Sequence, residues 1–322
     1  MYSNQEKVNL TMQATALPKF FFELDKTLSD CKTEVRRLFH GRGQCWAGLE
    51  QLTADWLGQQ LIVNLFKPVD DAFLKELKQG LVDFTQSTIW QQSEGKAIGL
   101  QHRYEHGAPF ELLFGELDVH PIGVENGLKY QLDVGRNQNS GLFLDMRLGR
   151  EWVRNESQGK SVLNLFSYTC AFSVVAIEGG ATNVVNVDMA KGALSRGRDN
   201  HRLNGHDLSN ISFLGHDILR SFGKITKYGP YDLIVIDPPS FQKGSFALTK
   251  DYKKVLRRLP SLLKEKGTVL ACVNSPAVTS DFLIDSMAEE APELIYQQRL
   301  ENPAEFADID EQASLKALIF IR

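Results

Sequence analysis

Cysteines are few in this sequence, and long apolar runs are missing. The four cysteines among 322 residues, at positions 31, 45, 170 and 272, include no CxxC pair, so we expect neither a zinc cluster nor a disulfide framework. No window reaches the ~18 consecutive apolar residues of a membrane span, and the first residues lack the charged-then-apolar order of a signal peptide. The seven histidines form no pattern typical of a metal site. We therefore expect a cytoplasmic protein that uses no metal and contacts no membrane.

The composition is that of a folded globular protein. Hydrophobic residues make up 43% of the chain and charged residues 24%, with a net charge of -4, and at ~150 residues per domain the length predicts two domains. The charge is unevenly spread, because residues 241–266 hold eight Lys or Arg against two acids, whereas residues 281–311 hold ten Asp or Glu against Arg299 alone. This distribution predicts a polarised surface with a basic patch that can hold a polyanion.

The first third of the chain mixes helix and strand patterns. Helical periodicity covers residues 26–40 and 70–85, and the apolar run at 61–66 between them predicts a strand. We expect an amino-terminal α+β domain over residues 1–110, which is a candidate for substrate recognition.

Strand patterns dominate the next segment, from residue 98 to 134. Within it, Asn126 and Gly127 are flanked by apolar residues and both adopt the positive φ of a tight turn readily. The sequence therefore predicts a β-hairpin, and we expect residues 111–140 to form a hairpin connector.

After residue 145 the pattern changes to apolar strands that alternate with helix-length segments. Strands this apolar are buried on both faces, which favours a parallel, doubly wound α/β sheet. Two further strands close the chain, the last of them antiparallel, which gives about seven strands in a domain over residues 141–322. A sheet of this kind binds its ligand at the carboxyl ends of its strands. The predicted strands are 161–166, 183–187, 211–214, 231–236, 267–273, 293–300 and 314–321.

The turn after the first of these strands, in the run NLFSYTCAF at 164–172, is a candidate cofactor site. A dinucleotide would require G-x-G-x-x-G there, because only glycine lets the backbone approach a pyrophosphate closely. That motif is missing, so a cofactor without phosphates fits better, and S-adenosylmethionine is the common one that carries adenosine. The alternative is a turn rich in Ser and Thr that only caps the next helix.

Two acids follow the second and third strands. Asp188 lies 24 residues after Asn164, a spacing that suits a carboxylate accepting hydrogen bonds from two ribose hydroxyls. Asp217 lies at the same edge of the sheet, where it can meet an adenine amino group. Capping of the helix that follows is the alternative role for Asp188.

The fourth strand ends in IDPPSF, residues 236–241, which is the most specific signal in the chain. Pro238 and Pro239 fix φ and remove two backbone donors, so that the Asp237 carboxylate is held outward and free to accept hydrogen bonds. This arrangement suits the amino edge of a base, and Phe241 offers a ring on which a base can stack. A rigid loop with Asp237 as a cap is the alternative.

Taken together, NLFSYT, VDM, DPPSF and the upstream GLFLDMR at 141–147 resemble the S-adenosylmethionine-dependent large-subunit ribosomal RNA methyltransferases. That family includes 5-methylcytosine enzymes and the guanine-N7 half of a bifunctional enzyme. The resemblance covers roughly residues 110–322. It implies a class I methyltransferase fold, which is Rossmann-like, with S-adenosylmethionine as cofactor and RNA, ribosomal by resemblance, as substrate.

The resemblance also assigns roles to individual residues by position. It implies that Phe166, Ser167 and Tyr168 form the cofactor turn. It implies a ribose contact for Asp188, with Met189 beside it, and an adenine contact for Asp217. Arg147 would pair with the carboxylate of the cofactor's methionine part. Asp237 would face the target base, with Pro238, Pro239, Phe241 and Lys243 beside the substrate. The basic residues after Lys243 would track an RNA backbone if they form a helix, although a solvated charged helix is the alternative.

Two departures from the family pattern bear on the chemistry. Cys170 replaces the usual glycine after NLFSYT, and its Cβ would crowd the cofactor unless φ stays negative. Asn274 stands where the 5-methylcytosine enzymes place a nucleophilic cysteine, and Cys272 lies about 6.6 Å further back along the strand. We therefore expect Cys272 to be a core residue and methylation at a nitrogen, with guanine N7 favoured. A small-molecule or protein methyltransferase, or a cofactor-binding module without catalysis, is the alternative.

Overall fold

The computed structural model describes residues 12–31, 33–135, 139–239, 241–242 and 246–322. Backbone contacts divide the chain into two compact units. The amino-terminal unit comprises the described residues up to Val124, with Leu132–Ser140 and Glu305–Ile309, and the carboxyl-terminal unit comprises Glu125–Gln131, Gly141–Ala304 and Asp310–Arg322. Neither unit is continuous in sequence.

The amino-terminal unit is built on a five-stranded sheet in the order β1-β2-β3-β4-β5. All neighbouring strands are antiparallel except β3 and β4, which run parallel because helices cross over between them. The strands are β1 Arg36–His40, β2 Leu52–Trp56, β3 Gln60–Leu65, β4 Ala97–His102 and β5 Phe110–Gly115. The strand predicted at 61–66 is thus confirmed as β3.

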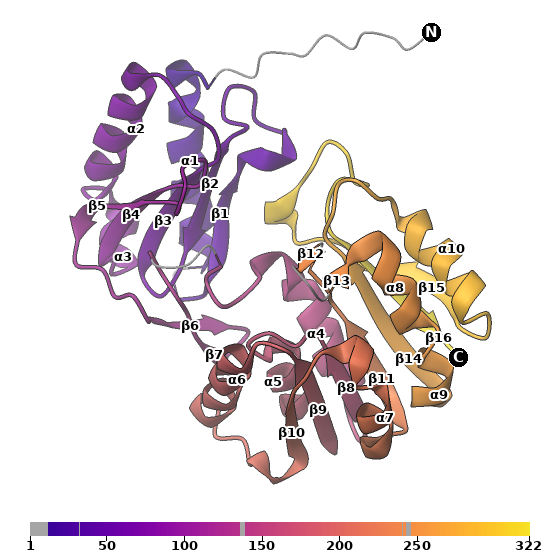
Figure 1. Ribbon diagram of the computed structural model, residues 1–322. Coiled ribbons are helices and arrows are strands. Elements are labelled where there is room, and N and C mark those ends of the chain that lie inside the picture. Colours follow the sequence, from indigo (N-terminus) through magenta and orange to yellow (C-terminus); the bar gives the residue numbers. More distant parts are fainter. Residues whose placement is uncertain (1–11, 32, 136–138, 240, 243–245) are drawn as a thin grey trace, which may run out of the picture. The chain divides into compact units, whose positions relative to one another are not determined.

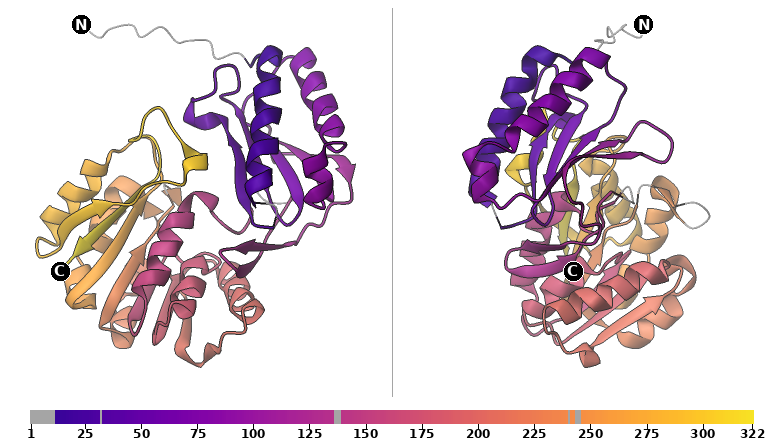
Figure 2. Two further views of the ribbon diagram at one scale, coloured as in Figure 1. Left: turned by 180° about the vertical axis from the view of Figure 1, so that it is seen from behind. Right: turned by 90° about the vertical axis from the view of Figure 1, so that its left-hand side faces the viewer.

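Helices α1 Leu17–Cys31, α2 Asp71–Phe84 and α3 Thr88–Gln92 pack against this sheet, and α1 and α2 lie side by side in front of it in the left view of Figure 2. The Asp70 carboxylate caps α2 by accepting a hydrogen bond from the Phe73 amide at 2.7 Å. The helix predicted at 70–85 is confirmed. The helix predicted at 26–40 is wrong, because α1 ends at Cys31 and pairing with β2 holds Arg36–His40 as a strand.

The predicted hairpin is present and falls at the division between the units. Strands β6 Ile122–Glu125 and β7 Leu128–Gln131 form a two-stranded sheet. Asn126 and Gly127 at its tip have φ of 49° and 80°, the left-handed values that this two-residue turn requires.

The carboxyl-terminal unit contains a seven-stranded sheet in the order β10-β9-β8-β11-β14-β16-β15 (Figure 1). The five strands from β10 to β14 are parallel, and β16 pairs antiparallel with both β14 and β15. The strands are β8 Ser161–Leu165, β9 Asn183–Asp188, β10 Ile211–Gly215, β11 Tyr231–Ile236, β14 Leu263–Val273, β15 Ile295–Arg299 and β16 Lys316–Ile321. All seven predicted strands are confirmed, the last as antiparallel.

Helices cover both faces of this sheet. One group, α4 to α6, packs on one face and the other, α7 to α10, on the opposite face (Figures 1 and 2), as expected for right-handed crossovers between parallel strands. The helices are α4 Arg147–Glu156, α5 Ala171–Glu178, α6 Lys191–Leu203, α7 Phe222–Ile225, α8 Leu248–Leu256, α9 Leu259–Leu262 and α10 Ser280–Glu290, and a short hairpin of β12 Phe241–Gln242 and β13 Phe246–Ala247 precedes α8.

Strand register decides where the site lies. Leu165 of β8 is level with Val187 of β9 and with Ile236 of β11, so the residues that follow these strands meet at one edge of the sheet. Within the described part of the chain, no helix has the length and apolar character needed to cross a membrane, and no cluster of three or more His, Cys, Asp or Glu side chains is arranged to hold a metal ion.

Candidate active site

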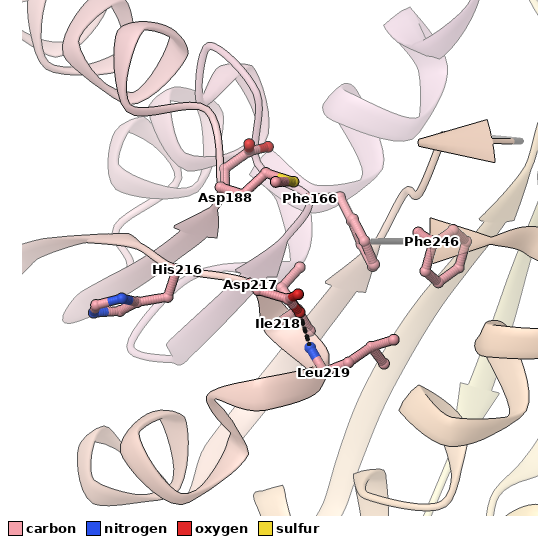
Figure 3. A pocket seen from close by; sticks show the side chains of 8 residues that line it. Phe166, Asp188, His216, Asp217, Ile218, Leu219 and Phe246 are labelled. Carbon is pink, nitrogen blue, oxygen red and sulfur yellow. Dashed lines mark hydrogen bonds between the residues drawn. The ribbon is translucent and has the colours of Figure 1, made fainter. Parts of the chain in front are cut away.

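A cleft opens at the carboxyl ends of β8, β9 and β10 (Figure 3). It has about 270 Å³ of space between its walls, continuous with solvent. Its eight lining residues include two carboxylates and five apolar side chains but neither Lys nor Arg; they are Phe166, Asp188, Met189, His216, Asp217, Ile218, Leu219 and Phe246. Because a phosphate group calls for cationic partners or backbone amides, this lining suits a nucleoside ligand without phosphates.

The turn between β8 and α5 forms one wall of this cleft and has an unusual backbone. Phe166, Tyr168 and Cys170 all have positive φ, at 58°, 46° and 61°, a conformation that costs non-glycine residues of order 1 kcal/mol each. Hydrogen bonds fix the turn, since the Ser167 amide donates to the Val187 carbonyl at 3.2 Å and the Tyr168 amide donates to Asp188 Oδ2 at 2.9 Å.

The side chain of Cys170 does not line the cleft. The predicted condition of a negative φ is not met, yet the thiol is fully buried and packs toward Gly197 of α6, which has no Cβ to oppose it. Burial raises the pKa of this thiol far above its ordinary value, so it stays neutral. The expected crowding of the cofactor is therefore avoided by the direction of the side chain.

Asp188 ends β9 and links the turn between β8 and α5 to the start of α6. Its Oδ2 accepts the Tyr168 amide at 2.9 Å and its Oδ1 accepts the Ala190 amide at 2.7 Å. Each carboxylate oxygen has a second lone pair, so the group is held firmly while it can still accept two hydrogen bonds from a ligand. The neighbouring Met189 is 43% exposed and lies on the cleft wall.

Asp217 lies across the cleft from the turn, after β10. Its Oδ1 accepts the Leu219 amide at 2.9 Å, which caps a short 3-10 helix at Ile218–Arg220. The carboxylate therefore caps this helix, a role that the sequence analysis did not predict, and it lines the cleft as well (Figure 3).

Beyond the cleft, the structure gathers Asp237, Asp145 and Asn274 into a polar cluster. Asp237 follows β11 and Asn274 follows β14, while Asp145 comes from a 3-10 turn at Leu144–Met146. The Asn274 amide donates to Asp145 Oδ2 at 3.0 Å. Burial, together with the negative charge of Asp145, raises the pKa of Asp237 to about 7, and the positive charge of Arg150 opposes that shift.

Asp145 was not among the predicted site residues, although it lies within the segment GLFLDMR at 141–147. The segment is fastened to the cofactor turn, because Thr169 Oγ1 donates to the Gly141 carbonyl at 2.7 Å. Its position is set further by Arg150 of α4, which donates to the Phe143 carbonyl at 2.8 Å and forms two hydrogen bonds of 2.6 Å with the carboxylate of Glu125. The Arg150 and Glu125 side chains are both only 2% exposed. The predicted Arg147 begins α4 and is half-buried.

The remaining predicted substrate residues follow Asp237. Pro238 is buried and Pro239 is exposed. Phe241 begins β12, but its side chain is outside the described part of the structure, and Lys243 lies outside the described residues altogether.

Two ion pairs link the basic and acidic windows of the sequence. Lys253 of α8 pairs with Glu289 of α10, and Arg257 pairs with Glu290 through hydrogen bonds of 2.6 and 2.9 Å. Two cations of the basic window are therefore neutralised by two carboxylates of the acidic window where α8 and α10 pack together, and the polarised surface stays a prediction. Sequence alone could not place them in contact, because the pairs are 33 and 36 residues apart.

A profile of the S-adenosylmethionine-dependent methyltransferase family matches residues 36–321. The chain belongs to this family. The doubly wound sheet predicted from the strand pattern and the class I methyltransferase fold implied by the resemblance are confirmed, and S-adenosylmethionine is confirmed as the cofactor of the family.

The chain is similar in sequence to curated proteins that are named as ribosomal RNA methyltransferases. YwbD of Bacillus subtilis (strain 168), a candidate ribosomal RNA large subunit methyltransferase, is 31% identical over 276 residues, covering 83% of this chain and 66% of the relative. Ribosomal RNA large subunit methyltransferase I of Aeromonas salmonicida (strain A449) is 32% identical over 232 residues, covering 69% of this chain and 57% of the relative. The predicted resemblance is confirmed, and the chain spans between 57% and 66% of the length of these two relatives.

A solved structure resembles nearly the whole chain. The crystal structure of SMU.776, a candidate methyltransferase in complex with SAH, has a TM-score of 0.82 and 26% identity, and the match covers 98% of this chain and 83% of that one. The likeness extends through the amino-terminal unit, which the sequence analysis had left without a relative.

Proposed function

We propose that this methyltransferase modifies a base nitrogen of ribosomal RNA, with guanine N7 as the target atom, by direct in-line transfer. The observation that carries the choice of a nitrogen is the state of the cysteines in the carboxyl-terminal unit. An RNA substrate is supported by the names of the relatives, and such a substrate agrees with the cytoplasmic location expected from the sequence.

Methylation at C5 of cytosine requires a thiolate that adds to the ring. Cys272 has none of the required properties: it is fully buried within β14, its carbonyl accepts a hydrogen bond from Tyr252 at 3.0 Å, and burial raises the pKa of its thiol well above the ordinary value. Cys170 is equally buried against Gly197. The residue directly after β14 is Asn274, whose amide cannot act as such a nucleophile. A nitrogen acceptor needs none, since guanine N7 carries a free lone pair.

S-adenosylmethionine, when bound, supplies a methyl group activated by its sulfonium. In our proposal Asp188 accepts hydrogen bonds from the two ribose hydroxyls and Asp217 accepts one from the adenine amino group. Phe166, Ser167 and Tyr168 form the wall beside the nucleoside, with Met189 next to the ribose and Arg147 toward the methionine carboxylate. The apolar lining and the free lone pairs of Asp188 support this arrangement.

The Asp237 cluster would hold the target base. A carboxylate can accept both the N1–H and amino N–H donors of guanine, which leaves N7 on the opposite edge of the base. Asn274 would hold a carbonyl or ring edge, and its hydrogen bond to Asp145 fixes its orientation. Positioning of this kind supplies most of the catalysis, because the methyl group is already activated. In duplex RNA the base would have to be flipped out of the helix. Phe241, four residues after Asp237 in the sequence, is proposed to stack on the flipped base.

The test is transfer of labelled methyl from S-adenosylmethionine to total RNA of a strain that lacks this protein, followed by nucleoside digestion and mass spectrometry. We expect labelled 7-methylguanosine. Labelled 5-methylcytidine would overturn the assignment to a nitrogen. Unlabelled RNA, with cofactor binding intact by calorimetry, would overturn the RNA substrate and favour a small molecule, a protein or an inactive module.

A further inference from the structure

The amino-terminal unit has a second group of side chains suited to binding, at one end of its five-stranded sheet. Arg37 lies on β1, Arg42 in the turn directly after β1, and Arg103 directly after β4. Phe66 follows β3, and the Arg103 amide donates to the Leu65 carbonyl at 2.8 Å. The strand registers bring the end of β1, the start of β2 and the ends of β3 and β4 to the same edge. We call Arg37, Arg42, Arg103 and Phe66 the arginine cluster.

Aromatic rings hold the guanidinium groups of the cluster. The guanidinium carbon of Arg42 lies 4.3 Å from the centre of the Phe66 ring, and that of Arg103 lies 5.5 Å from it. Arg37 lies 4.8 Å from the ring of Phe306, which belongs to the same unit. A guanidinium that rests on a ring is ordered in advance, so it loses less freedom when it binds a ligand.

Like charges are crowded together in this cluster. Partial burial and the neighbouring Arg37 lower the pKa of the Arg42 guanidinium, and burial and Arg42 lower that of Arg103. Asp55 pairs with Arg37 through hydrogen bonds of 2.5 and 3.3 Å. Burial and the two nearby arginines also lower the pKa of His40 to about 3, so this ring stays neutral. A polyanion would relieve the repulsion between these cations.

The turn that carries Arg42 is tightly packed. A Cβ on Gly41 would lie 1.9 Å from the Leu49 carbonyl oxygen, and one on Gly43 would lie 1.9 Å from the Ala307 carbonyl oxygen. The Ile309 amide also donates to the Gly43 carbonyl at 2.9 Å. Arg42 is exposed between two glycines that accept no side chain, so the packing fixes where this cation stands.

We propose that the arginine cluster is a contact surface for an unpaired segment of the RNA substrate. The Arg42 and Arg103 guanidinium groups bind backbone phosphates, whereas Arg37 stays paired with Asp55. The plane of Arg42, supported by Phe66, offers a flat face on which an unpaired base can stack. The inference rests on the proposed RNA substrate and gives the amino-terminal unit a role in holding it. A lipid surface is the other common polyanion, but it has no bases to use the planar faces.

The experiment measures binding of a fluorescent single-stranded RNA of about 20 nucleotides at several salt concentrations. The variants are Arg42→Gln, Arg42→Lys and the double variant Arg42→Gln/Arg103→Gln, and Lys75→Gln on the exposed face of α2 removes one charge from the same unit as a control. We expect Arg42→Gln to weaken binding roughly fivefold or more and to lower the salt slope by about 0.7. Arg42→Lys should keep the slope but lose affinity, and Lys75→Gln should change neither.

Thermal unfolding and calorimetry with SAH separate binding from folding. Arg42→Gln should melt no lower than the parent, because it removes like-charge repulsion, and it should bind SAH unchanged. The inference is overturned if Arg42→Gln binds RNA as tightly and with the same slope, or if the cluster binds phosphatidylserine vesicles and no RNA. If Arg42→Gln binds RNA like the parent and methyl transfer to RNA persists, the role of the arginine cluster is refuted and the proposed activity is not. Arg42-dependent RNA binding without any transfer refutes the proposed activity alone.

Discussion

The thiol of Cys170 occupies the space into which a side chain on Gly197 would project. A Cβ built on Gly197 would lie 2.3 Å from Cys170 Sγ and 2.8 Å from Cys170 Cβ. The two residues are 27 positions apart, at the start of α5 and within α6. Their sizes are complementary, because the Cys170 side chain fills the space that is left open by the missing Cβ of Gly197.

Replacement of Gly197 by Ala should therefore destabilise the protein, although alanine is the better helix former. Overpacking of a tight core typically costs about 1 to 3 kcal/mol, which exceeds the gain of about 1 kcal/mol from helix propensity. Gly192, in the same helix, is the matched control because a Cβ there meets no atom within 4 Å, and Gly192→Ala should be neutral or stabilising. Chemical denaturation measures both. A second change, Cys170→Gly, should rescue Gly197→Ala, and equal effects of Gly197→Ala with and without it would contradict the complementarity.

Asp188→Asn should weaken cofactor binding by about 1 to 3 kcal/mol, the usual cost of an unmatched buried polar group. The carboxylate accepts hydrogen bonds from the Tyr168 and Ala190 backbone amides. In the asparagine variant the side-chain NH2 group would face one of these two N–H groups, and that hydrogen bond would be lost. Calorimetry with SAH measures the loss. Asp207→Asn provides the control, since Asp207 accepts the Ser209 amide at 2.9 Å in a turn outside the cleft. Undiminished affinity in Asp188→Asn would show that the ribose is held elsewhere.

The pH dependence of stability should report on Asp237. Its pKa in the folded protein is about 7, raised from 3.8 by burial first and by Asp145 second. The folded state therefore binds the proton more tightly than the unfolded state, and stability is lost as pH rises from about 4 through about 7. Asp237→Asn removes this loss, so the melting temperature of the variant minus that of the parent should increase from pH 5 to pH 8. Parallel melting curves across this range would contradict the raised pKa.

Methyl transfer should follow the same ionisation. If ionised Asp237 accepts hydrogen bonds from the base, single-turnover transfer rises with pH through about 7, and Asp237→Asn abolishes both the rise and most of the transfer while SAH still binds. Asp145→Asn removes the like charge that raises the pKa of Asp237, so it should move the midpoint of the profile to lower pH. A midpoint that stays at the parent value would exclude this electrostatic coupling.

Cys272→Ala tests the choice of a nitrogen acceptor most directly. Because the thiol is fully buried in β14, we expect a loss of stability of about 1 kcal/mol for the small cavity and methyl transfer within about twofold of the parent once the variant is folded. A folded Cys272→Ala variant without transfer would instead identify Cys272 as the nucleophile of a 5-methylcytosine enzyme.

Much of the site could be predicted because it lies at strand ends. The ends of β8, β9, β10 and β11 are apparent in the sequence as apolar runs, and parallel register then brings Phe166, Asp188, Asp217 and Asp237 to one edge of the sheet. Interactions between distant segments were beyond the pattern. Asn274 and Asp145 are 129 residues apart, and their contact depends on how the segment before α4 is fastened to the cofactor turn.

The wrong helix prediction has the same physical origin. The helical spacing at residues 26–40 continues past Cys31 by coincidence, and pairing between Arg37 and Asp55 on neighbouring strands overrides it. The ion pairs of Lys253 and Arg257 were likewise beyond the sequence pattern, because their partners on α10 come more than 30 residues later.

The segment Glu305–Ile309 has a consequence for biosynthesis. It completes the amino-terminal unit through the ion pair of Glu305 with Arg36 at 3.5 Å, the Phe306 ring under Arg37, and the hydrogen bond from Ile309 to Gly43. On the ribosome, residues 12–124 emerge long before this segment is translated. The amino-terminal unit is synthesised first. It therefore acquires its last contacts only after six of the seven strands of the carboxyl-terminal sheet, all except β16, have been translated.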